Sequence, residues 1–132
     1  MENIFSTDNP ALSRMHREAD GIQAYMNAPA RLEDPASMTY RLNDLDVYMS
    51  RLGEMLTSAK AMKEKAQNEF WNQNEAELTK LTATIQNRKI NAHLFEYATL
   101  YTRLDTMYHT LEHLTRDLVT QISYIKQQMI MH

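Results

Sequence analysis

Apolar residues recur at helical spacing along most of the chain, and this pattern predicts three helices. The helices are expected over residues 10–28, 35–71 and 75–131. The first two begin where a capping side chain is followed by proline, at Asn9-Pro10 and Asp34-Pro35. The third follows a predicted break at residues 72–74, where Asn74 and Glu77 resemble a capping box. Residues 1–9 are predicted to form a disordered lead-in.

The apolar positions also predict how these helices pack. In the second helix they alternate in steps of four and three, which is a heptad seam: Met38, Leu42, Leu45, Met49, Leu52, Leu56 and Ala59. Lys63 fills the next seam position and interrupts it. The third helix carries a less regular seam, whose stutter near the end locally straightens a left-handed supercoil. The expected fold class is therefore all-α, with coiled-coil-like seams.

Two architectures satisfy this pattern. In the first, a long antiparallel helical hairpin turns at residue 73. Its third helix would span roughly 85 Å and its second roughly 55 Å, so the third would overhang and need covering by the first helix or by a second copy. In the second, the third helix breaks near residues 87–91 and a compact four-helix bundle results. Both are three- to four-helix arrangements of a single domain over residues 1–132.

Composition narrows the class of protein. With only two glycines and three prolines in 132 residues, a sheet protein with many turns is disfavoured. The absence of cysteine excludes disulfides, thiolate metal sites and a cysteine nucleophile. The net charge of −3 disfavours a protein that coats duplex DNA. No apolar run is long enough to cross a membrane, and the N-terminus does not resemble a signal peptide, so a cytoplasmic protein is expected, in a cell or an infected host.

The stretch HTLEH at residues 109–113 has the His-x-x-Glu-His spacing of some zinc peptidases. On a helix, His109 and His113 lie one turn apart, and Asp105 is a third ligand candidate. The peptidase pattern needs a further acidic ligand on a later helix, whereas Asp117 is the only acid after Glu112. We therefore interpret the histidines as flanking the seam and pairing with nearby carboxylates, and we expect neither a metal nor a cofactor.

Other catalytic arrangements are missing from the sequence. A phosphate-cradling loop needs clustered glycines, which the chain lacks. Carboxylates such as Asp44 and Asp46 diverge on a helix because they are two residues apart. The Glu-x-x-His motif of bundle di-metal sites occurs nowhere. The sequence therefore predicts a protein without catalytic activity.

A basic cluster near the predicted turn favours a nucleic-acid interface as an alternative function. Its cations are Lys60, Lys63, Lys65, Lys80, Arg88 and Lys89, and the candidate binding residues are Lys60, Lys63, Arg88, Lys89 and the aromatic Trp71. Cations beside aromatic rings can hold single-stranded nucleic acid through phosphate contacts and stacking. Glutamates in the same region weaken the positive field, so nucleic acid is possible but is not the favoured partner.

Two surfaces are predicted to bind protein. The C-terminal stretch is apolar over more than one helical stripe, which is typical of an interface with another copy or another protein. Its candidate residues are Leu118, Ile122, Tyr124, Ile125, Met129 and Ile130. An acidic face is predicted on the second helix, and it would occupy a basic groove of a nucleic-acid enzyme. Its candidate residues are Asp34, Asp44, Asp46 and Glu54.

The segments LEHLTRDLVTQISYIKQQM (111–129) and LDVYMSRLGEML (45–56) resemble the small, cysteine-free helical accessory proteins of tailed phages and prophages. That resemblance implies a virion component, a replication or recombination helper, or an inhibitor of a host nuclease, and it assigns no functional residue. The function expected from the sequence is therefore a non-catalytic protein-interaction protein that self-associates. The alternatives are a single-strand-binding accessory protein and a structural virion spacer.

Overall fold

The computed structural model describes residues 9–28 and 34–131. These residues form four α-helices and no strand: α1 (Pro10–Asn27), α2 (Pro35–Leu78), α3 (Ala83–His93) and α4 (Phe95–Met131). The predicted all-α class is confirmed. Residues 1–8 of the lead-in predicted over residues 1–9, and the connection at residues 29–33, lie outside the described residues.

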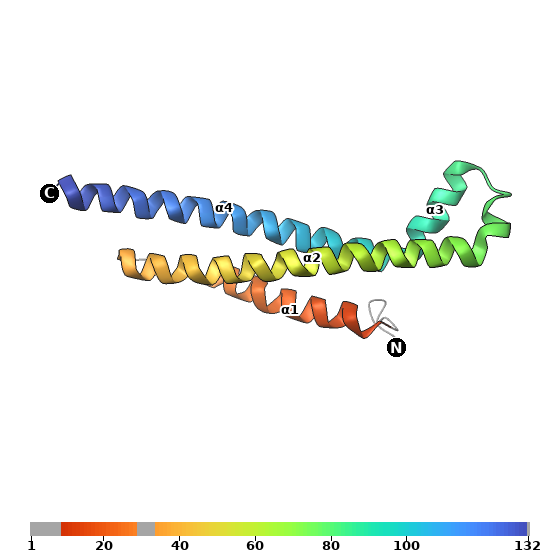
Figure 1. Ribbon diagram of the computed structural model, residues 1–132, viewed down its shortest axis with the longest axis horizontal. Coiled ribbons are helices and arrows are strands. Elements are labelled where there is room, and N and C mark those ends of the chain that lie inside the picture. Colours follow the sequence, from red (N-terminus) through yellow and green to blue (C-terminus); the bar gives the residue numbers. More distant parts are fainter. Residues whose placement is uncertain (1–8, 29–33, 132) are drawn as a thin grey trace.

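The helices form an elongated arrangement built on one long antiparallel pair (Figure 1). α2 and α4 lie side by side, and α1 lies against their middle, running in the same direction as α4. α3 lies at the far end of α2, where it carries the chain back from α2 to α4. At the opposite end, the C-terminal turns of α4 extend beyond the first residues of α2.

The starts of α1 and α2 agree with the predicted caps. The Asn9 side-chain oxygen accepts a hydrogen bond from the Ala11 backbone N–H at 3.0 Å, and an Asp34 carboxylate oxygen accepts one from the Ser37 N–H at 2.7 Å. Each bond satisfies a donor that the first helical turn would otherwise leave unpaired. The proline that follows each cap has no N–H to satisfy.

The predicted break at residues 72–74 is wrong, because α2 continues to Leu78. The Asn74 side chain does not cap a helix but donates to the Phe70 carbonyl at 2.8 Å, inside α2. The end of α2 is held from further along the chain. The Gln86 amide donates to the carbonyls of Leu78 at 2.7 Å and Leu81 at 3.2 Å, and the Leu78 carbonyl also accepts from the Leu81 N–H at 3.0 Å.

The helix predicted over 75–131 is likewise not continuous. Thr82 begins α3 by accepting a hydrogen bond from the Ile85 N–H. A second interruption falls at Leu94, a few residues beyond the predicted alternative break at 87–91. Leu94 is buried, and the Phe70 and His93 rings stack with centroids 4.3 Å apart. The His93 ring therefore packs against α2 at the point where α3 ends.

The core follows the two predicted seams and adds a third contribution from α1. Buried seam residues include Leu45, Leu52, Leu104 and Leu111. They belong to one cluster with three residues of α1, namely Leu12, Ala19 and Ile22. Because a third helix contributes here, the buried region is wider than a two-helix seam. This explains why it also takes in three residues outside the predicted seams, Met55, Leu100 and Met107.

Two arginines, one from each long helix, attach α1 to the α2/α4 pair. Arg51 of α2 donates to both carboxylate oxygens of Glu18, at 2.6 and 2.8 Å. Arg103 of α4 donates to Asp20 at 2.6 Å and lies 3.1 Å from His16 Nδ1. Bidentate arginine–carboxylate pairs fix geometry as well as charge. These contacts therefore set the register of α1 on the pair.

Acidification is expected to loosen α1. Burial and the neighbouring Arg103 lower the pKa of His16 from its ordinary value of 6.5, and the hydrogen bond from Arg51 lowers the pKa of the Glu18 carboxyl from 4.5. The folded protein thus binds fewer protons than the unfolded chain, so both groups stabilise it at neutral pH. That stabilisation is lost as the pH falls, first below 6.5 for His16 and then below 4.5 for Glu18.

Hydrogen exchange followed by mass spectrometry, corrected for intrinsic rates, should show weaker protection of α1 at about pH 5.5 than at about pH 7.5. The variant His16→Gln should lose this difference, because its side chain does not titrate. Equal protection of α1 at both pH values in the unmodified chain would contradict the expectation that protonation of His16 loosens α1.

Candidate functional site

The predicted interface at the end of α4 divides into a buried and an exposed part. Leu118 and Ile122 belong to the intramolecular core, and Ile125 is partly buried against it. These residues already contact the rest of the chain. Exposed large apolar side chains lie at Tyr124, Met129, Ile130 and Met131, of which Ile130 is 84% exposed. We call these four residues the α4 end patch.

The geometry of the fold explains why this patch is uncovered. α2 begins at Pro35, and its first buried residue is Met38. α4 continues past this point, as Figure 1 shows. Since α1 lies against the middle of the pair, no described helix covers the last turns of α4. The α4 end patch is therefore a helical surface with apolar side chains in solvent.

The α4 end patch is also nearly free of charge. Between residues 118 and 131, Lys126 is the only Asp, Glu, Lys or Arg. Tyr124 adds one hydroxyl to the thioether and aliphatic groups of the other members. Exposed apolar patches with little charge are typical of protein–protein contacts. The chemistry of the patch therefore suits an apolar surface more than a charged ligand.

The structure does not bring the four predicted acidic residues together as one unpaired face. Asp34 caps α2, and Asp44 accepts a hydrogen bond from the Tyr25 hydroxyl at 2.8 Å. Glu54 pairs with Arg51 at 2.9 Å. Asp46 lies in a shallow depression with Glu54 and Arg51. Because Asp44 turns toward α1 while Asp46 lies two residues on, the predicted acidic face is divided by helix geometry.

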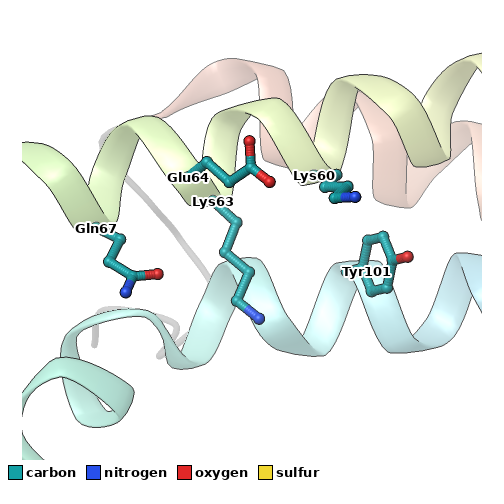
Figure 2. Close-up of a pocket in the computed structure, with 5 residues that line it drawn as sticks. All are labelled: Lys60, Lys63, Glu64, Gln67 and Tyr101. Carbon is teal, nitrogen blue, oxygen red and sulfur yellow. The ribbon is translucent and has the colours of Figure 1, made fainter. Parts of the chain in front are cut away.

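The predicted basic cluster is divided as well. Lys60 and Lys63 line a groove between α2 and α4, together with Glu64, Gln67 and Tyr101 (Figure 2). Arg88 and Lys89 are exposed on α3, and Trp71 is partly buried. Sequence reasoning identified the two lysines but missed Gln67 and Tyr101. The interruption of the heptad seam by Lys63 was the available signal for this groove.

The two histidines of the HTLEH stretch lie on the exposed surface of α4, whereas Leu111 between them is buried. His109 is close to two carboxylates, with Nδ1 3.0 Å from Glu112 and Nε2 3.5 Å from Asp105. His113 is exposed. Within residues 9–28 and 34–131, no three His, Asp or Glu side chains are arranged to hold a metal ion. The pairing of His109 with both carboxylates agrees with the structural interpretation of this motif.

No helix in the described part of the chain is both long enough and apolar enough to cross a membrane. Comparison with protein-family models, with curated proteins and with solved structures finds no match to this chain.

Proposed function

We propose that this chain is a non-catalytic protein-interaction protein that self-associates through the C-terminal end of α4. The observation that carries the proposal is the α4 end patch, four large apolar side chains that are each exposed around the last two turns of α4. Burying such side chains contributes roughly 25 cal/mol for each Å² of apolar surface removed from water. Binding to this patch is therefore most favourable for a partner that presents an apolar surface of its own.

A second copy of the chain supplies that surface. Lys126 is the only charged side chain in the last fourteen described residues of α4, so two copies meet with little electrostatic repulsion. In a two-fold dimer the same patch serves on both sides and must only be self-complementary. The patch is much smaller than the roughly 20–30 residues a side of a standard interface. We therefore expect a dimer that dissociates on dilution.

The variant Ile130→Asp tests this proposal. Ile130 is the most exposed apolar residue of the patch. A carboxylate at this position would lose its water on association, which costs free energy, and each of the two copies would contribute one. Light scattering should show association weakened at least about tenfold. Circular dichroism should show unchanged helix content, because Ile130 makes no core contact.

Val47→Asp is the matched control, since Val47 is exposed on α2, outside the patch. It should leave the association constant unchanged. If both aspartate variants weaken association equally, or if neither does, the α4 end patch is not the interface.

A further inference from the structure

A second candidate site lies in the groove between α2 and α4, away from the α4 end patch. Its lining residues are Lys60, Lys63, Glu64, Gln67 and Tyr101, and its volume is about 270 Å³. Figure 2 shows Lys63 and Gln67 reaching from α2 toward α4, while Tyr101 rises from α4. Glu64 stays over α2, on the side away from α4. The groove therefore collects polar side-chain tips from both long helices.

These polar tips lack partners of their own. In the described part of the chain, Lys60, Lys63, Gln67 and Tyr101 make no side-chain hydrogen bond or ion pair. An ammonium group is only a donor, and the Gln amide and Tyr hydroxyl each have N–H or O–H groups to offer. Two lysines against one glutamate leave the lining with a net charge of +1. Unpaired donors and a positive charge together favour an anionic ligand.

The place of Lys63 in the fold strengthens this inference. It occupies the seam position between Ala59 and Ala66, both of which are buried. Lys63 itself is half-buried. Its aliphatic stem can pack along the seam while the ammonium group stays in the groove. An apolar residue would bury more surface at this seam position, whereas the lysine places a cation in the groove.

We propose that this groove binds a phosphate group. The Lys60 and Lys63 ammonium groups would neutralise the anionic oxygens, as lysine does at other phosphate sites. The Gln67 amide and the Tyr101 hydroxyl would donate to the remaining oxygens. Figure 2 shows the Glu64 carboxylate over α2, on the opposite side from the Lys63 ammonium group, so Glu64 does not pair with that ammonium.

The size of the groove limits the class of ligand. Sites that enclose a whole small molecule usually have volumes of roughly 300–1,000 Å³, and this groove lies just below that range. It fits a phosphate group and its immediate attachment, with the rest of the ligand outside. Two sources have this chemistry, namely the phosphodiester backbone of single-stranded nucleic acid and a free phosphorylated small molecule. This inference does not depend on self-association through α4.

Binding experiments on the full chain distinguish these sources. Fluorescence anisotropy with a labelled oligothymidylate measures binding of single-stranded nucleic acid. NMR titration with pyrophosphate measures binding of a phosphorylated small molecule. Lys60→Gln and Lys63→Gln remove the charges while keeping side chains of similar length. We expect each to weaken binding several-fold, and the double variant to weaken it at least about tenfold at low salt. Increasing salt should weaken binding in the unmodified chain.

Lys65→Gln is the matched control. Lys65 lies two residues from Lys63 but outside the groove, with a side chain that is 78% exposed. Its variant should bind as the unmodified chain does. Lysine-dependent binding of the oligothymidylate alone assigns the nucleic-acid source, and binding of pyrophosphate alone assigns the small molecule. Failure of both probes to bind, or equal weakening by Lys65→Gln, would overturn the proposal.

Discussion

Replacing Leu104 by alanine is expected to lower the free energy of unfolding by about 2–5 kcal/mol. Leu104 is fully buried and belongs to the cluster to which α1, α2 and α4 all contribute. The substitution removes three carbon atoms from a region enclosed by three helices. The cavity closes only partly, so the lost transfer free energy is accompanied by a cavity cost. Urea unfolding followed by circular dichroism measures the loss.

Val119→Ala on the same helix is the control for this prediction. Val119 is 46% exposed, so its loss should stay below about 1 kcal/mol. Both variants should be compared at one protein concentration, because the proposed self-association would make apparent stability depend on concentration. Equal losses in the two variants would contradict the three-helix core described above.

Replacing Lys63 by leucine is expected to raise the free energy of unfolding by about 1 kcal/mol. Full burial of a leucine side chain contributes roughly 1.5–3 kcal/mol, and position 63 is about half-buried. The leucine would restore the interrupted seam between Ala59 and Ala66. The same variant should weaken the proposed phosphate binding several-fold, because it removes one of the two ammonium groups of the groove.

Increased stability together with weaker phosphate binding would indicate that Lys63 serves ligand binding and not the packing of the fold. Urea unfolding measures the gain, and Lys65→Leu serves as its control at an exposed position on the same helix. That control should gain no stability. A destabilised Lys63→Leu variant would show that the lysine contributes to the packing of α2 on α4.

Much of the fold could be predicted from the sequence because its signals are local. Asn9-Pro10 and Asp34-Pro35 each contain a cap and a proline within two residues, and both helix starts were correct. The end of α2 was missed because the group that holds it, the Gln86 amide, comes eight residues after Leu78. The interruption at Leu94 has no glycine or proline beside it, so no breaker residue indicated it.

The candidate sites were less predictable because they depend on how the helices align. The apolar pattern runs through Leu118 and Ile122 into the α4 end patch, and it does not mark the residue at which burial ends. Only the position of α2 decides that these two are buried while Ile130 is exposed. In the same way, Tyr101 reaches the lysine groove because α4 aligns with α2 there. The sequence pattern offered a break between α3 and α4 only as the second architecture, near residues 87–91, whereas the interruption falls at Leu94.

The mass of the unmodified chain in solution, measured by light scattering over a series of concentrations, tests the proposed self-association most directly. The chain has a mass of 15.5 kDa. We predict that the measured mass rises with concentration toward twice this value and falls back on dilution. A mass that stays at 15.5 kDa at every concentration would contradict self-association through the α4 end patch.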